Sequence, residues 1–306
     1  MSEDYRKYLN PQIVSKLKSI ELKAKAIVEG FITGLHKSPY HGFSVEFAEH
    51  RQYTFGDEVR HVDWRVYART GRYYVKQYEE ETNLCAYILL DTSSSMRFSS
   101  DKKFLPKIEY ATYLAAALTL LMIQQRDAVS LVTYSNRLHQ FLPPSVKPSH
   151  QTLILKTLAE VSKQVAHTTG EKTSTASALA EFAKRLEKRS LLIIISDFWD
   201  ELEKTIAALK HFRHRQNEVI AFHLLDKVER DFDIGSDVEL LDVETGEVIT
   251  TSPKQIRMAY RTACEAHIGT LRRNLTDNGI DYVLLETAMS FDLALLAYLR
   301  KREEIM

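Results

Sequence analysis

Short, mainly apolar runs alternate along the chain with longer stretches in which apolar residues recur at helical spacing. The runs cover residues 84–90, 127–134, 191–195, 218–225 and 280–285. Such runs are typical of strands buried on both faces of a parallel sheet. Residues 103–125, 150–166, 176–188, 201–215, 253–275 and 291–300 are predicted helices. The alternation predicts an α/β domain with a doubly wound, mostly parallel sheet.

Two further strand signals modify this pattern. A short strand is expected at residues 138–142, before the break at Pro143 and Pro144. A β-hairpin insertion is expected near residues 238–250, where two short runs flank a turn signal. The predicted α/β domain therefore covers residues 83–306 and includes this hairpin.

The first 82 residues have a different pattern. Asn10 and Pro11 are typical of a helix start, and apolar residues follow helical spacing until Gly30 and Gly34, which we expect to end the helix. Residues 43–81 interleave arginines and carboxylates with tyrosine and tryptophan. This mixture predicts a small β subdomain held by Arg–carboxylate pairs and aromatic packing. A partner-docking surface is the alternative, because Arg, Tyr and Trp dominate binding hot spots.

Composition excludes several classes of protein. Lys plus Arg and Asp plus Glu both number 41, so there is no net charge to favour nucleic-acid binding. The two cysteines, Cys85 and Cys264, are too few for a disulfide framework and fit a reducing compartment. No apolar run approaches the ~20 residues of a membrane helix, and the N-terminus lacks a secretory signal. We expect a cytoplasmic protein without an integral membrane segment.

The candidate chemistry lies at the end of the first apolar run. Asp91, Ser93 and Ser95 follow it with the spacing Asp-x-Ser-x-Ser. Open α/β sheets bind their ligands at the carboxyl ends of the strands. One carboxylate and two hydroxyls suit a hard cation such as Mg²⁺, with Mn²⁺ as an alternative. These residue types also serve as ordinary helix caps and turns.

Two later segments support the metal interpretation. Thr173 lies in a polar loop before the helix 176–188, with Thr175 as the alternative threonine. Asp197 follows the apolar run 191–195, so it is expected at the same sheet edge as Asp91. Either Thr173 or Asp197 could instead cap a helix. Together the five candidate metal-binding residues are Asp91, Ser93, Ser95, Thr173 and Asp197.

These three separated elements resemble the metal-ion-dependent adhesion site of von Willebrand factor A domains. In that family the serines, the threonine and the aspartates contact Mg²⁺, directly or through water, and a partner's carboxylate completes the coordination. The resemblance covers roughly residues 84–300. It implies a von Willebrand factor A-like fold and a binding role for this chain.

A second resemblance covers nearly the whole chain. Its motif is Tyr53-x-x-Gly56-Asp57-x-x-Arg60-x-x-Asp63-Trp64-x-x-x-Ala68-Arg69-Thr70-Gly71. This motif, with Asp242-x-Glu244-Thr245-Gly246-Glu247, is similar to the signature of the bacterial domain-of-unknown-function family number fifty-eight. Proteins of that family carry an A-like domain and are commonly encoded beside MoxR-type AAA+ ATPases. The resemblance implies such an ATPase as a partner, in chaperone-like assembly or activation of a client protein.

The sequence therefore favours a non-enzymatic, Mg²⁺-dependent protein-binding module. A metal-dependent hydrolase or phosphatase is the rival, and it would need a nucleophile or base near the ion. Ser94 and His167 are the nearby candidates for that role. The chain has no Gly-x-x-x-x-Gly-Lys-[Ser/Thr] loop, which argues against intrinsic ATP hydrolysis. A metal-free scaffold with a degenerate site is the third interpretation.

Overall fold

The computed structural model describes residues 9–37, 50–52, 64–76, 84–100, 104–163, 175–186, 188–234, 238–241, 248–251 and 253–305. The chain divides into two compact units, Met1–Lys37 with Leu84–Met306, and Ser38–Asn83. The predicted boundary at residues 82/83 grouped the N-terminal helix with the segment that follows it. The structure instead places that helix in the larger unit, because its apolar stripe packs on a helix of the α/β domain.

In the described part of the larger unit, a six-stranded sheet has the order β10-β7-β6-β3-β4-β5. The strands are β3 (Cys85–Asp91), β4 (Ala128–Tyr134), β5 (Leu138–Ser145), β6 (Leu191–Ser196), β7 (Glu218–Leu225) and β10 (Asp281–Glu286). All neighbours pair in parallel except β5, which is antiparallel to β4 at the edge. The predicted doubly wound, mostly parallel α/β sheet is confirmed.

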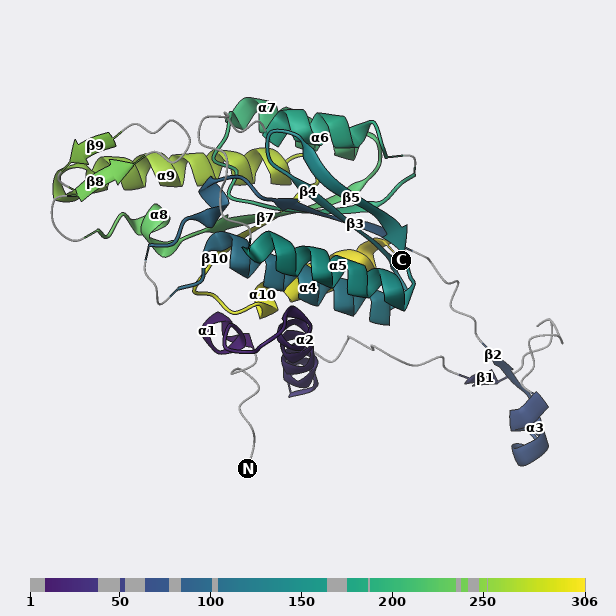
Figure 1. The fold of residues 1–306 in the computed structure, drawn as a ribbon. Coiled ribbons are helices and arrows are strands. Elements are labelled where there is room, and N and C mark those ends of the chain that lie inside the picture. The colour runs from purple at the N-terminus through teal and green to yellow at the C-terminus, as the bar shows by residue number, and fades with distance from the viewer. Residues whose placement is uncertain are drawn as a thin grey trace. The chain divides into compact units, whose positions relative to one another are not determined.

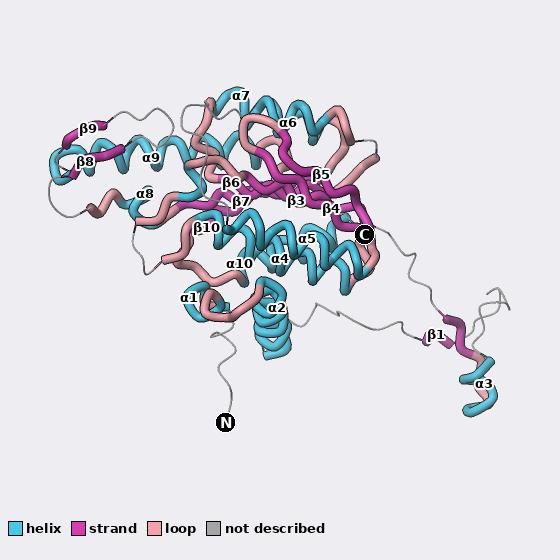
Figure 2. The backbone as a smooth tube through the Cα atoms, in the orientation of Figure 1, coloured by secondary structure: helices cyan, strands magenta, loops and turns pink. Residues whose placement is uncertain are grey.

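Helices cover both faces of this sheet (Figures 1 and 2). One face is covered by α4 (Lys107–Gln124), α5 (Pro148–Lys163) and α10 (Asp292–Ile305). The other is covered by α6 (Thr175–Ala183), α7 (Leu202–His214) and α9 (Pro253–Thr276). Every residue of β6 and β7 is buried, which is why these strands are apolar almost throughout.

An additional layer lies outside α4. There α2 (Ile20–Lys37) packs against α4 and buries Ala24, Ile27, Val28 and Phe31. The short helix α1 (Pro11–Val14) precedes it, with the Asn10 side chain accepting a hydrogen bond from the Gln12 amide. The N-terminal helix predicted from the sequence is thus two helices. The second continues through Gly30 and Gly34 to Lys37, because packing on α4 outweighs the helix cost of glycine.

Two other elements differ from the sequence expectation. Strand β5 continues through Pro143 and Pro144 to Ser145, which an edge strand with a shifted register tolerates. The helix α8 (Lys227–Asp231) follows β7 and was not expected. It is only five residues long and begins with a capping box formed by Asp226 and Glu229.

The remaining strands form two small sheets. The hairpin strands β8 (Val238–Leu241) and β9 (Val248–Thr251) pair antiparallel, as predicted. In the smaller unit, β1 (His50–Gln52) pairs antiparallel with β2 (Tyr74–Lys76). Helix α3 (Trp64–Thr70) lies between these two strands in the sequence. The Tyr67 ring stacks on Tyr73 with 4.4 Å between centroids. The smaller unit thus contains a strand pair and an aromatic stack, while its Arg–carboxylate pairs stay a prediction and residues 53–63 of the family motif lie outside the described part.

The strand order reverses between β3 and β6, which makes the carboxyl ends of these two strands the topological switch point of the sheet. Ligands of open α/β sheets bind at this place. Separately, no helix among the described residues is long and apolar enough to cross a membrane.

Candidate metal-binding site

The loop after β3 brings three predicted ligands together. Asp91 is the last residue of β3, and its Oδ1 accepts a 2.9 Å hydrogen bond from the Ser93 amide. The Ser93 and Ser95 hydroxyl oxygens are 3.0 Å apart. The loop is anchored to β4 because the Thr92 amide and hydroxyl both donate to the Tyr134 carbonyl, at 2.7 and 2.9 Å. Asp91, Ser93 and Ser95 thus share one fixed loop.

The loop after β6 meets this loop across the switch point. Ser196 donates its hydroxyl to Asp91 Oδ2 at 2.6 Å, and Asp197 follows with only 3% of its surface exposed. Phe198 then takes a left-handed backbone conformation, with φ 50°, and its amide donates to the Ser196 hydroxyl. The prediction that Asp91 and Asp197 lie at one edge of the sheet agrees with this geometry.

Asp91 carries a carboxyl group whose charge is poorly compensated. Burial, and after it the neighbouring Asp197 charge, raise its pKa from 3.8 to about 7. The hydrogen bonds from Ser196 and Ser93 oppose this shift only in part. A buried carboxylate with a like charge beside it favours a proton or a cation.

Lys107 provides the one ammonium in contact with these carboxylates in the described structure. Its side chain is fully buried in the first turn of α4. The Nζ atom lies 2.7 Å from Asp197 Oδ2 and 2.5 Å from Glu229 Oε1. Burial lowers its pKa, but the two carboxylates more than reverse this, so the pKa of Lys107 lies above its ordinary value and the ammonium stays charged.

Glu229 links this ammonium to α8. Its Oε2 accepts a 2.8 Å hydrogen bond from the Asp226 amide, which is half of the capping box, while Oε1 contacts Lys107. The Asp226 carboxylate accepts from the Val228 amide and from both the amide and hydroxyl of Ser100. The loop after β3, the loop after β6, α4 and α8 are therefore joined by one polar network.

The sequence interpretation missed Lys107 and Glu229. From sequence, a lysine in the first turn of a helix is expected to be exposed to solvent. Lys107, however, lies in a helix whose other residues are mostly buried. The spacing Asp226-x-x-Glu229 is a readable capping-box signal, but the second role of Glu229 depends on a contact 122 residues away in sequence. Only the fold brings that contact about.

Of the two candidate threonines, the structure describes only Thr175. Thr173 lies outside the described residues, so its role stays a prediction. The alternative, Thr175, is buried at the start of α6, and its amide donates to Asp200 Oδ2 at 2.6 Å. Because Asp200 follows Asp197 by three residues, the start of α6 is tied to the loop that carries Asp197.

Aromatic and histidine side chains line the β7 side of the site. His223 is buried, its Nδ1 lies 2.7 Å from the Tyr282 hydroxyl, and burial lowers its pKa to about 3. It therefore contributes no positive charge near neutral pH. Trp199, which follows Asp197 by two residues, stacks on His267 with 4.6 Å between ring centroids. Of the residues proposed for a rival hydrolase, Ser94 precedes the 3-10 helix η3 (Ser95–Arg97) without a capping hydrogen bond, and His167 lies outside the described part.

The donor set fits a hard divalent cation. Two carboxylates and two serine hydroxyls supply oxygen ligands, as Mg²⁺ prefers. Asp91, Asp197 and Glu229 oppose one ammonium, so the fully ionised cluster keeps two uncompensated negative charges. Within the described ranges, no group of three or more His, Cys, Asp or Glu side chains is arranged to hold a metal. A metal here would rely on the serine hydroxyls as well as on carboxylates.

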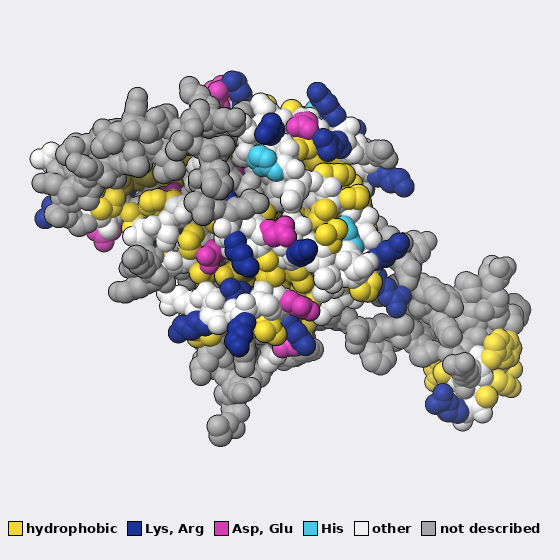
Figure 3. All heavy atoms as spheres, in the orientation of Figure 1, with side chains coloured by type: hydrophobic (Ala, Val, Ile, Leu, Met, Phe, Trp, Pro, Cys, Tyr) yellow, Lys and Arg dark blue, Asp and Glu magenta, His cyan; other side chains and the backbone are white. Residues whose placement is uncertain are grey.

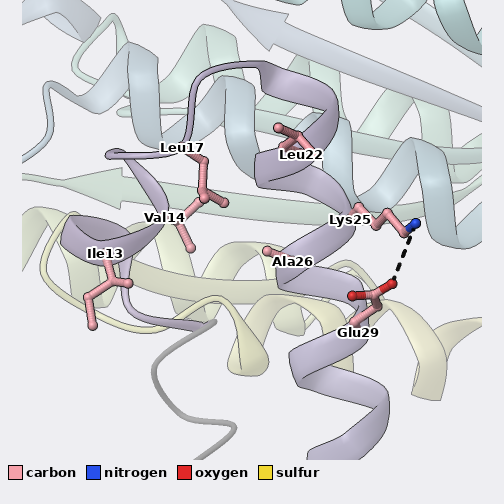
Figure 4. Close-up of a pocket in the computed structure, with 7 residues that line it drawn as sticks. All are labelled: Ile13, Val14, Leu17, Leu22, Lys25, Ala26 and Glu29. Atoms are coloured by element: carbon pink, nitrogen blue, oxygen red, sulfur yellow. Dashed lines mark ion pairs between the residues drawn. The ribbon is translucent and has the colours of Figure 1, made fainter.

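Other surfaces of the larger unit are less specific. A hollow of about 340 Å³ lies between α1 and α2, lined mainly by apolar side chains such as Ile13 and Leu22 and by the Lys25–Glu29 ion pair (Figure 4). Positive and negative side chains are interspersed over the face drawn in Figure 3. The described part of that face thus has charges of both signs, in keeping with the equal numbers of acidic and basic residues.

The fold and the site define a class of protein: a doubly wound α/β domain with a buried acidic and hydroxyl-bearing site at its switch point. The chain belongs to the family described as "Protein of unknown function DUF58", which it matches over residues 49–269. A relative, "Uncharacterized protein Rv1480" from Mycobacterium tuberculosis, is 28% identical over 284 residues, covering 91% of this chain and 86% of the relative. The family resemblance found in the sequence is confirmed.

Solved structures show distant similarity. The solved chain of the hypothetical protein BatB from Bacteroides thetaiotaomicron is 14% identical, with a TM-score of 0.48 over 72% of this chain and 98% of that one. The von Willebrand factor A domain of Rpn10 is 12% identical, with a TM-score of 0.36 over 69% of this chain and 94% of that domain. Similarity at this level says nothing about what the chain binds.

Proposed function

We propose that this chain is a non-enzymatic, Mg²⁺-dependent protein-binding module. Asp91, Ser93, Ser95, Thr173 and Asp197 would hold the ion. The observation that carries the proposal is the pair of buried carboxylates, Asp91 and Asp197, at the switch point, with only one ammonium to balance a cluster of three carboxylates. A buried cluster with two surplus negative charges is stabilised by a divalent cation.

The residues of the site have separable roles. The amide of Ser93 and the hydroxyl of Ser196 orient the Asp91 carboxylate. The Ser93 and Ser95 hydroxyls supply neutral oxygens, which leave more positive charge on a cation than carboxylates would. A bound Mg²⁺ would supply a coordination position for a carboxylate from the partner protein. The partner is therefore expected to offer an exposed Asp or Glu.

The family resemblance suggests the kind of partner. We infer that a MoxR-type AAA+ ATPase acts together with this chain, in chaperone-like assembly or activation of a client. Either the ATPase or the client would provide the carboxylate. The described surface around Trp199, which is 37% exposed beside Asp197, would lie at the rim of that contact.

The proposal is tested by calorimetric titration of Mg²⁺ and Mn²⁺ into the metal-free chain. We expect the Ser93→Ala/Ser95→Ala variant to lose most of the binding, because two neutral oxygen ligands are removed while the buried Lys107–Asp197 ion pair stays intact. Asp277→Asn, an exposed change after α9, serves as the matched control and should bind like the wild type. Equal, negligible heats from folded wild type and variant would refute the metal site and favour a metal-free scaffold.

The same protein samples also test the alternative that this chain is an enzyme. Phosphatase substrates offered with Mg²⁺ should show no turnover. Turnover that the Ser93→Ala/Ser95→Ala change abolishes would move the site to the class of metal-dependent hydrolases.

A further inference from the structure

The proposed function counts the charges of Lys107 and Glu229 but gives this ion pair, between a buried lysine and a partly buried glutamate, no role of its own. We propose that Lys107 is a built-in counter-ion that balances Asp197 while the site is metal-free, and that Glu229 is the carboxylate that retains the ammonium when a divalent cation binds. The inference rests on the proposed metal site and deepens it. The ion pair would stabilise the buried acidic site when no metal is bound, and it would leave the site able to bind the metal.

The contacts of Lys107 support this division of roles. Its Nζ contacts one carboxylate oxygen of Asp197, Oδ2, and one of Glu229, Oε1. The other Asp197 oxygen, Oδ1, accepts a 3.4 Å hydrogen bond from the Trp199 amide. The ammonium therefore balances Asp197 without covering both of its oxygens, and it already has a second partner in contact.

The charges of the cluster give the same answer. If Glu229 were neutral, Lys107 would cancel Asp197, and Asp91 alone would remain to attract a cation. Because Glu229 Oε1 contacts the ammonium of Lys107, the carboxylates of Asp91 and Asp197 are both left to face a divalent ion. The nearby Asp226 carboxylate is not part of this ion pair, and it accepts three hydrogen bonds from Ser100 and Val228.

Glu229 permits a clean substitution. Glutamine preserves a capping box, because its side-chain oxygen can still accept from the Asp226 amide. Glu229→Gln thus removes a charge from Lys107 while the start of α8 is kept. Lys107→Met/Glu229→Gln removes both members of the pair and returns the two remaining carboxylates, Asp91 and Asp197, to a net charge of two.

The experiment measures Mn²⁺ affinity by calorimetry and the unfolding midpoint in EDTA for wild type and both variants. Glu229→Gln should weaken Mn²⁺ binding about tenfold or more, because one unit of negative charge near the ion is lost. The Mn²⁺ affinity of Lys107→Met/Glu229→Gln should be no more than about threefold weaker than that of the wild type. In EDTA it should unfold at a lower temperature than wild type, because two buried carboxylates then lack a counter-ion.

Glu265→Gln is the matched control, since Glu265 pairs with Arg230 at the exposed side of α8. It should change neither measurement. Wild-type Mn²⁺ affinity in Glu229→Gln, or wild-type stability in EDTA for the double variant, would overturn the inference. If Glu229→Gln does not fold, weakened Mn²⁺ binding by the double variant overturns it. Absence of binding by the wild type is a separate result that overturns the metal site itself.

Discussion

At the residue scale, Asp91 is the side chain in which burial, charge and hydrogen bonding conflict most directly. Its carboxylate accepts from the Ser93 amide and the Ser196 hydroxyl, yet burial and Asp197 still raise its pKa to about 7. A raised pKa in the folded state means that the folded protein binds the proton more tightly than the unfolded chain does. The contribution of Asp91 to stability is therefore fully present below the pKa that this carboxyl has in the unfolded chain. It is lost as the pH rises through the pKa of Asp91 in the folded protein.

We expect the metal-free chain to lose stability between about pH 4 and pH 7 through Asp91, by roughly 4 kcal/mol at most. Asp91→Asn should remove this part of the pH dependence, because the amide does not ionise. Urea unfolding in EDTA at pH 5, 6, 7 and 8 measures the difference between the two proteins. Parallel pH profiles for wild type and Asp91→Asn would contradict the burial of an ionisable Asp91.

The sequence predicted Asp91, Ser93, Ser95 and Asp197 because each follows an apolar run, and the ends of parallel strands meet at one edge. The same reasoning could not find Lys107, whose partners lie 90 and 122 residues away. No periodic pattern encodes such a contact. Long-range ion pairs inside a core depend on how helices are placed over the sheet, which local spacing does not determine.

At the element scale, the N-terminal helix α2 has become part of the α/β core. The periodic spacing of its apolar residues predicted the helix correctly, but it did not indicate the surface that the helix covers. The structure packs α2 on α4, so the stability of the sheet unit should depend on a helix that lies before the smaller unit in sequence. For strand β5 the sequence prediction was wrong in a different way. Pro143 and Pro144 suggested that the strand ends before them, but an edge strand tolerates proline and β5 continues to Ser145.

Ile27→Ala should lower the free energy of unfolding of the larger unit by roughly 2–4 kcal/mol, because Ile27 is fully buried between α2 and its neighbours. Ile13→Ala, in the exposed part of α1, is the matched control and should cost less than about 1 kcal/mol. Urea unfolding followed by far-ultraviolet circular dichroism measures both. An unchanged midpoint for Ile27→Ala would mean that α2 does not belong to the cooperative unit.

At the scale of the whole molecule, the two candidate partner-binding surfaces belong to different compact units. The site at the switch point lies in the larger unit, whereas the Arg- and aromatic-rich segment of residues 43–81 lies in the smaller one. The proposed function assigns carboxylate binding to the first of these surfaces. The second remains the alternative docking surface that the sequence suggested.

The full chain should bind a purified MoxR-type AAA+ ATPase, and Ser93→Ala/Ser95→Ala should weaken that binding at least about tenfold if the contact is completed at the metal. The measurement is surface immobilisation of the chain and titration of the ATPase at constant Mg²⁺, because chelation would also disable the ATPase. Asp277→Asn is the control. Equal affinities for wild type and the double serine variant would assign the contact to another surface, such as the smaller unit.

The separation of α2 from α4 in the chain has a consequence during synthesis. Residues 20–37 leave the ribosome long before residues 107–124, which cover them in the folded protein. At ~5–20 residues per second, several seconds pass between the two. During that interval the stripe formed by Ala24, Ile27, Val28 and Phe31 has no α4 to pack on. The apolar stripe of α2 therefore stays without its partner helix until α4 has been synthesised, and the larger unit cannot complete its packing before then.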